Sequence, residues 1–193
     1  FLAASFACDD AYMYCMAASS KYRAPLYIVD VMRFKDEESL RYLSINLNNL
    51  YNNLKSRVEQ TSSIEEVVRL SNATIAIKNK IDVLRTDFPG IMESSDSFRL
   101  FTLYNDLGRI QALNIFNELY ETLRKKTAGY GLIQCPRLLW LGLIPLYNNG
   151  ILSRTEQRYN CRIVYEELFD FGNTYISADD FFSDLSKRIT LSN

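Results

Sequence analysis

The first residues of the chain that could carry chemistry are Cys8, Asp9 and Asp10, which directly follow the apolar run Phe1–Ala7. Such a run is typical of a β-strand buried on both faces, as in a parallel sheet. Ligands of open α/β sheets bind where the strands end, so Cys8 is a candidate reactive or metal-ligating residue and Asp9 lies at the same edge. A cysteine at the end of a buried strand is also commonly a small core residue, and this alternative stays open.

Two further predicted strands end in residues that could line a site. The strand Arg137–Gly142 ends at Gly142, and the strand Cys161–Tyr165 is followed directly by Glu166 and Glu167. A glycine there lets the backbone approach a ligand or simply turn. Paired carboxylates could exchange protons or hold a metal, but neighbours on a strand point to opposite faces, so at most one faces a site. Solvated acids are the alternative. The chain contains neither GxGxxG nor GxxxxGK[ST], which excludes the dinucleotide and P-loop motifs.

The amino-acid composition is typical of a globular protein, and it excludes several kinds of catalytic and metal site. The 193 residues are 48% hydrophobic and 23% charged, with a net charge of −1 and no basic block, which argues against nucleic acid and anionic membrane as partners. No apolar stretch reaches the roughly 18 residues that span a bilayer. The chain has no histidine, which removes Ser-His-Asp and Cys-His catalysis and imidazole zinc sites. Its four cysteines lack CxxC spacing, and reduced cytoplasmic thiols are expected for Cys8, Cys15, Cys135 and Cys161.

The pattern of apolar residues predicts an α/β fold, with small parallel sheets flanked by helices and a largely helical middle region. Residues 1–35 are predicted to end a first α/β domain, 36–130 to be helical, and 131–193 to form a second α/β domain. In the first part, a helix over Asp10–Ser19 joins the opening strand to a second buried strand, Pro25–Val31, as a parallel βαβ unit.

The helices follow from apolar spacings of three and four residues. One helix is predicted to begin near Asp36. Ser63 and Glu66 have the form of a capping box at the start of a helix that runs to about Arg85. Further helices are predicted for these segments: Ser95–Leu107, Arg109–Arg124, Leu152–Tyr159, and one that begins at Ser177–Asp180.

The order of these parts matches a known family. A buried strand ends in Cys8-Asp9, and a Pro-x-x-x-Val-Asp strand (Pro25–Asp30) follows before a long helical insertion. An Arg-Leu-Leu-Trp-x-Gly strand, a helix with Glu156, and an Arg-Ile-Val-x-Glu-Glu strand (Arg162–Glu167) close the pattern. This arrangement resembles the 2-hydroxyglutaryl-CoA dehydratase D-component family, which includes the benzoyl-CoA reductase catalytic subunits. The resemblance covers nearly the whole chain.

The resemblance implies an enzyme, a lyase from an organism with anaerobic metabolism. Family members pair as two related subunits, and each subunit typically holds a [4Fe–4S] cluster by three cysteines. An ATP-hydrolysing activator supplies one electron for the radical dehydration of a 2-hydroxyacyl-CoA. Family chains are about twice as long, so the resemblance also implies that this chain is the C-terminal part of a longer one.

Residue by residue, the resemblance makes Cys8 the second cluster cysteine and places the first upstream of this chain. The third belongs just after the strand of Glu166 and Glu167, where this sequence has no cysteine. Glu167 is therefore a candidate replacement ligand, while Asp9, Gly142 and Glu166 would line the substrate cleft. The alternatives are a cluster-free relative that acts as a structural or binding subunit, and an unrelated α/β binding module.

Overall fold

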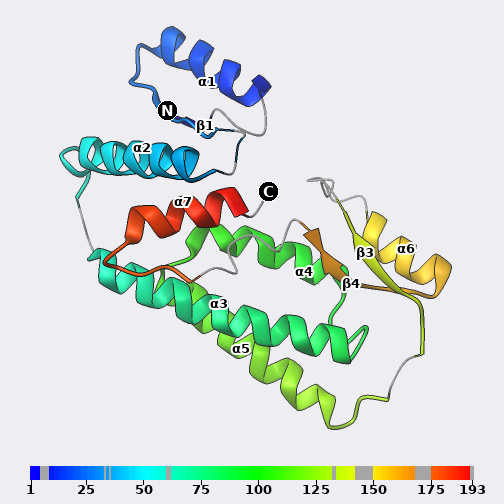
Figure 1. Ribbon diagram of the computed structural model, residues 1–193. Helices are drawn as coiled ribbons and strands as arrows, with labels where there is room; N and C mark the ends of the chain where they lie inside the picture. The colour runs from blue at the N-terminus through cyan, green and yellow to red at the C-terminus, as the bar shows by residue number, and fades with distance from the viewer. Residues whose placement is uncertain are drawn as a thin grey trace. The chain divides into compact units, whose positions relative to one another are not determined.

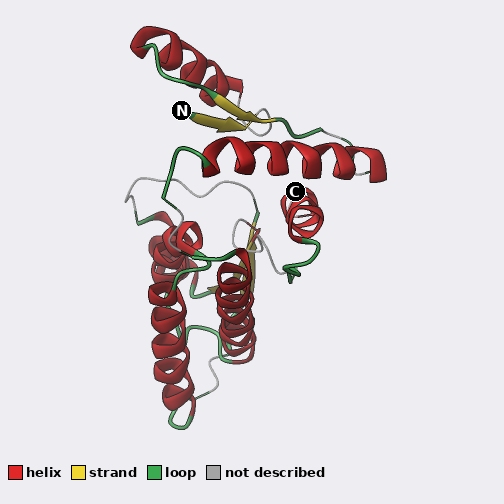
Figure 2. Ribbon diagram, turned by 90° about the vertical axis from the view of Figure 1, so that its left-hand side faces the viewer, coloured by secondary structure: helices red, strands yellow, loops and turns green. Residues whose placement is uncertain are grey.

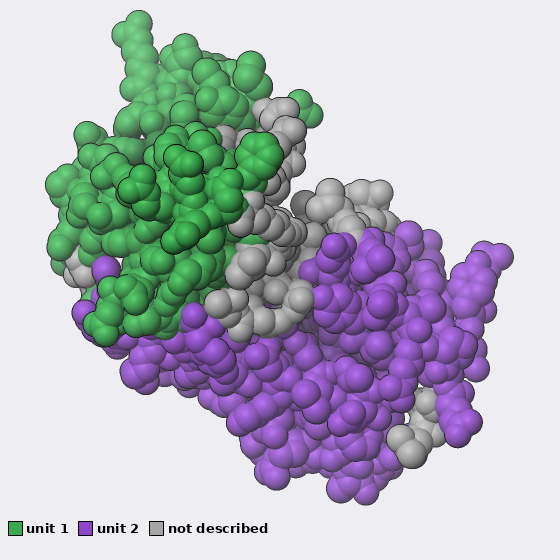
Figure 3. Space-filling view, viewed as in Figure 1, with its two compact units in different colours: residues 1–63, 176–193 green, residues 64–175 purple. Residues whose placement is uncertain are grey.

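The computed structural model describes residues 1–4, 9–32, 34, 36–59, 62–131, 134–141, 150–167 and 175–191. The chain divides into two compact units, coloured separately in Figure 3. Unit 1 consists of Phe1–Ser63 and Ile176–Asn193, and unit 2 is the uninterrupted stretch Ile64–Tyr175. The predicted domain boundaries lie at residues 35 and 130, and the two units divide the chain at other places. The helix after Asp36 and the last helix both belong to unit 1.

Unit 1 begins with the predicted parallel βαβ unit. Strands β1 (Leu2–Ala4) and β2 (Tyr27–Val29) pair in parallel, and helix α1 (Asp9–Tyr22) connects them (Figure 2). The register pairs Leu2 with Tyr27, whose backbone N–H donates to the Phe1 carbonyl at 2.9 Å. This confirms the strand–helix–strand prediction, with a second strand shorter than Pro25–Val31.

The rest of unit 1 is a helix pair, α2 (Glu37–Lys55) and α7 (Phe181–Leu191), which pack together. Asp36 caps α2, since its carboxylate accepts a hydrogen bond from the Ser39 N–H at 2.7 Å. The Ser39 side chain first, and then this N–H, lower the pKa of Asp36 by hydrogen bonding to its carboxylate. Leu43 and Leu47 are buried, and the Tyr51 and Phe182 rings lie 5.7 Å apart. The helices predicted to begin near Asp36 and at Ser177–Asp180 are confirmed.

Unit 2 is built on two long helices, α3 (Ile64–Asp87) and α5 (Ile110–Thr127), which lie side by side (Figure 1). Helix α4 (Ser94–Phe101) lies between them in sequence and continues as a 3₁₀ helix, η1 (Thr102–Asp106). The helix predicted over Ser95–Leu107 thus tightens in its second half, as helix ends commonly do. The core of this part consists of Ile81, Ile91, Met92, Phe116 and Leu123.

The second sheet completes unit 2. Strands β3 (Arg137–Trp140) and β4 (Arg162–Glu166) pair in parallel, with helix α6 (Ile151–Tyr159) between them in sequence. The register shifts at Leu138/Leu139, where Leu138 faces Ile163 and Leu139 faces Tyr165, so Val164 is an extra residue on β4. A bulge of this kind changes which side chains of the strand point inward.

One sequence prediction is wrong: the two strands of the first βαβ unit, which the sequence predicts to be buried, are partly exposed. β4 is mostly buried, but Leu2 of β1 is 59% exposed and Leu139 of β3 is 65% exposed. Ile28 of β2 is also exposed. The physical reason is the size of the sheets. A strand in a sheet of two has one bonded neighbour only, and of these strands β4 is the one that packs against α3, α4 and α6.

We predict that Phe116→Ala lowers the free energy of unfolding by about 3–5 kcal/mol, because it leaves a cavity in the α3–α5 core. Phe116 is 1% exposed. The matched control is Ile115→Ala on the same helix, at a side chain that is 44% exposed, and its effect should be below about 1 kcal/mol. Urea unfolding of both variants measures the difference, and equal effects would contradict the packing described here.

Candidate functional site

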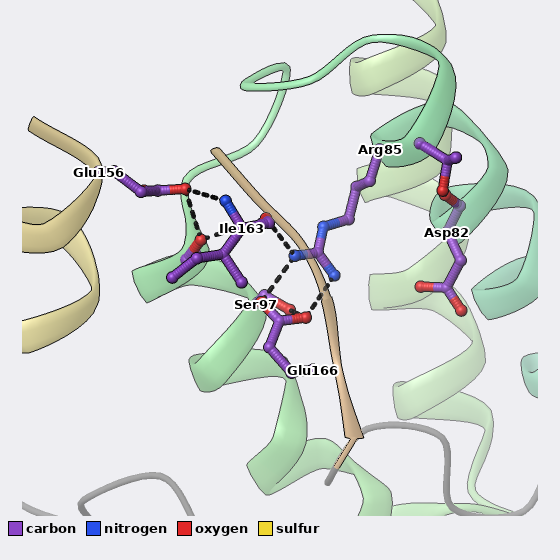
Figure 4. A network of polar contacts seen from close by, with 8 residues as sticks. Asp82, Arg85, Ser97, Glu156, Ile163 and Glu166 are labelled. Carbon is purple, nitrogen blue, oxygen red and sulfur yellow. Dashed lines mark hydrogen bonds and ion pairs between the residues drawn. The ribbon is translucent and has the colours of Figure 1, made fainter. Parts of the chain in front are cut away.

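Unit 2 contains a buried ion pair between Arg85, near the end of α3, and Glu166, the last residue of β4. Arg85 Nη2 lies 2.7 Å from Glu166 Oε1 and Nη1 lies 2.9 Å from Oε2, so the pair is bidentate (Figure 4). The Arg85 side chain is 6% exposed and that of Glu166 is 0% exposed. Such a pair is stable out of water only when its geometry is good and further hydrogen bonds satisfy it.

Two further contacts satisfy this ion pair. The Ser97 hydroxyl of α4 donates to Glu166 Oε2 at 3.3 Å, and Arg85 Nη2 also reaches the Ile163 carbonyl at 3.4 Å. Figure 4 shows these groups converging on the Arg85 guanidinium and the Glu166 carboxylate from α3, α4 and β4. The carboxylate of Glu166 is therefore committed to protein partners on both oxygens.

A second buried carboxylate, Glu156 of α6, holds the other end of β4. Glu156 is 6% exposed, and its Oε1 accepts from the Ser94 hydroxyl at 2.7 Å and from the Ile163 N–H at 2.9 Å. Together the two glutamates join α3, α4 and α6 to one short strand. This arrangement fixes β4 rather than offering a carboxylate to a ligand.

The space beside the ion pair is small. Lys78 and Asp82 of α3 pair at 2.7 Å beside it, and Lys78 is 6% exposed. A cavity of about 10 Å³ lies between these residues, Arg85 and Glu166. That volume is at the lower limit for one water molecule, so no substrate fits there.

The five predicted site residues are placed as follows. Cys8 and Gly142 lie outside the described residues, and Asp9 is the first residue of α1 in unit 1, with its side chain also outside the description. Glu166 is buried in the Arg85 pair, and Glu167 directly after it is exposed. Glu166 and Glu167 therefore do point to opposite environments. Their assignment to a cluster or a cleft stays a prediction.

Sequence reasoning did not find Arg85, Ser94 and Ser97 as the partners of the buried carboxylates. A signal was present in α3, where buried residues recur at spacings of four, three and four. Two basic residues share that face with core residues, a pattern that predicts buried acids nearby. The face consists of Thr74, Lys78, Ile81 and Arg85.

The described cysteines do not provide a three-thiolate set for a cluster. Cys15 lies on α1 of unit 1, whereas Cys135 and Cys161 belong to unit 2. Cys161 is 2% exposed, and its thiol lies 3.6 Å from the Thr155 carbonyl. Within the described ranges, no group of three or more Cys, Asp or Glu side chains could hold a metal ion. These residues therefore do not fit a [4Fe–4S] cluster by themselves.

The family is decided by comparison with protein-family models. The model of the 2-hydroxyglutaryl-CoA dehydratase D-component matches residues 1–190. The chain belongs to the 2-hydroxyglutaryl-CoA dehydratase D-component family. This confirms the resemblance inferred from the order of the motifs. The match gives no support to the expectation that the chain is the C-terminal part of a longer one.

Membership of this family has one direct consequence for assembly. A D-component is one part of a multi-component dehydratase system, so the family implies a partner subunit. A search of the curated proteins gave no match. In the part of the chain that the structure describes, no helix has the length and apolar character needed to cross a membrane.

We predict that Glu166→Gln lowers the free energy of unfolding by about 3–5 kcal/mol, because it leaves the Arg85 charge buried without its counter-ion. Glu121→Gln is the matched control, since it breaks an ion pair with Arg124 in which both side chains are about half exposed. That variant should unfold like the wild type. Urea unfolding measures the free energy of unfolding of both variants. An equal decrease in both would show that the buried pair stabilises the protein no more than the exposed pair does.

Proposed function

We propose that this chain is one subunit of a 2-hydroxyacyl-CoA dehydratase-like enzyme, a lyase that removes water from a CoA thioester. The observation that carries the proposal is the family match across residues 1–190. In this proposal the chain works with a related sibling subunit, and an ATP-dependent activator protein supplies the electron that starts the reaction. An acyl-CoA is the substrate.

The cofactor of the proposal is a [4Fe–4S] cluster, which supplies one-electron chemistry when bound. Cys8 is the thiolate that this chain would contribute. Glu167 is the candidate further ligand, because it is exposed and lies one residue beyond the fixed end of β4. A carboxylate is a harder ligand than a thiolate and suits iron–sulfur clusters less well, so the contribution of this chain is an incomplete set.

The second candidate function is a cluster-free subunit that supports an active sibling. Two observations on β4 favour it. Cys161, the cysteine nearest in sequence to the expected third ligand, is buried at the opposite end of the strand. Glu166 is bound to Arg85 and Ser97, and so its carboxylate is engaged within the protein.

Iron and acid-labile sulfide analysis of the chain, purified without oxygen together with its sibling subunit, tests the first proposal. We expect Cys8→Ser to remove the iron bound by this chain, because it removes the thiolate that the proposal requires. The matched control is Cys15→Ser on α1, which should keep the iron content of the wild type. Dehydratase activity with an acyl-CoA should follow the iron content.

The outcomes separate the two candidates. If the wild-type chain carries no iron and Cys8→Ser dehydrates at the wild-type rate, the cluster-bearing role is refuted and the supporting role remains. If the sibling dehydrates equally fast without this chain, both candidates are refuted.

A further inference from the structure

A cavity of about 490 Å³ lies in unit 2, away from the buried ion pair. It is bounded by the turn after α3, by α4 and by α5. Its volume is typical of small-molecule sites, which combine an apolar lining with a few polar groups. Leu100 and Leu119 provide a half-buried apolar lining, while Leu123 and Ile91, which also line the cavity, are only 1% and 4% exposed.

The wall of this cavity is held in place by the core. Gly90 has a φ of +87°, and a Cβ atom there would lie 2.7 Å from Arg162 Nε, so the backbone follows a path that favours glycine. The next residues, Ile91 and Met92, are buried in the α3–α5 core. The Tyr130 hydroxyl donates to the Pro89 carbonyl at 2.8 Å and fixes the turn from the other side. The cavity is therefore formed by the fold itself.

The charged side chains at the rim of the cavity differ in the partners that they have within the protein. Asp96 pairs with Arg99 at 3.0 Å, and Glu93 accepts a hydrogen bond from the Ser95 hydroxyl at 3.2 Å. Lys126, in the last turn of α5, also lines the cavity. Its backbone carbonyl accepts a hydrogen bond from the Gly129 N–H, but among the described residues its ammonium group has neither an ion-pair nor a hydrogen-bond partner. Two rim charges thus lack an ion-pair partner among the described residues: the Glu93 carboxylate, which has the Ser95 hydroxyl, and the Lys126 ammonium, which has no side-chain partner and lies beside an apolar surface.

We propose that this cavity binds a small amphiphilic carboxylate, with its carboxylate at Lys126 and its alkyl chain on Leu100 and Leu119. The lysine would supply a charge-assisted hydrogen bond and the leucines would shield the chain from water. This site is independent of the proposed dehydratase function, because it uses neither Cys8 nor the residues at the end of β4.

The test is isothermal titration calorimetry of the full chain with sodium octanoate, below the concentration at which octanoate forms micelles. We expect saturable binding that weakens about fourfold for each CH₂ group removed, as hexanoate and butyrate replace octanoate. Octylamine, which has the same chain and the opposite charge, should not compete with octanoate. The dependence of the affinity on chain length measures the contribution of the apolar lining. The comparison of octanoate with octylamine tests whether the site prefers a negative ligand.

Two variants of neighbouring lysines locate the site. Lys126→Gln should weaken octanoate binding about tenfold, because it removes one charge-assisted contact. Lys125→Gln makes the same change of net charge one residue away, outside the cavity lining, and should leave the affinity within about twofold of the wild type. Circular dichroism confirms that both variants keep their helices.

Three results would overturn the proposal: no saturable heat with octanoate, equal loss in the two lysine variants, or equally tight binding of octylamine. The equal loss would mean that Lys126 acts through general charge, together with its neighbours in the last turn of α5.

Discussion

The ion pair of Arg85 and Glu166 constrains unit 2 more than any apolar contact described above, because a buried charge tolerates little displacement. Both side chains have left water almost completely, and the bidentate geometry with the Ser97 and Ile163 contacts compensates for that loss. A shift of α3, α4 or β4 by the length of a hydrogen bond would leave a charge unpaired in the interior. The three elements are thus held in one arrangement, and Glu156 adds α6 to it through Ser94 and the Ile163 N–H.

Local patterns predicted the elements of this fold well. The spacing of Leu43 and Leu47 marks the buried side of α2, and Asp36 marks its beginning, because both signals act within a few residues. The predicted parallel sheets follow from strand–helix–strand order, which leaves few other topologies. The burial of the strands was overestimated, since apolar composition does not reveal how many strands share a sheet.

The candidate site was less predictable, for a reason that lies in β4. The sequence shows that Glu166 and Glu167 point apart, but it does not show which of them points inward. The extra residue Val164 decides this, since the shift of register brings Glu166 to the buried face. Its partner Arg85 is 81 residues away in the chain, beyond the reach of any local pattern. By contrast, the order of weak motifs around Cys8 and Glu156 was enough to indicate the family.

The division of unit 1 into two stretches has a consequence for how the protein is made. Unit 2 is one continuous stretch of the sequence. It comes after α2 and before α7 along the chain, although α2 and α7 pack on each other in unit 1. On the ribosome, unit 2 is synthesised before α7 and emerges ahead of it, and domains generally fold as units in the order of their synthesis. The apolar side of α2, with Leu43 and Leu47, therefore lacks its packing partner until α7 has been synthesised. A chain that stops after Tyr175 retains every residue of unit 2 but leaves unit 1 without its closing helix.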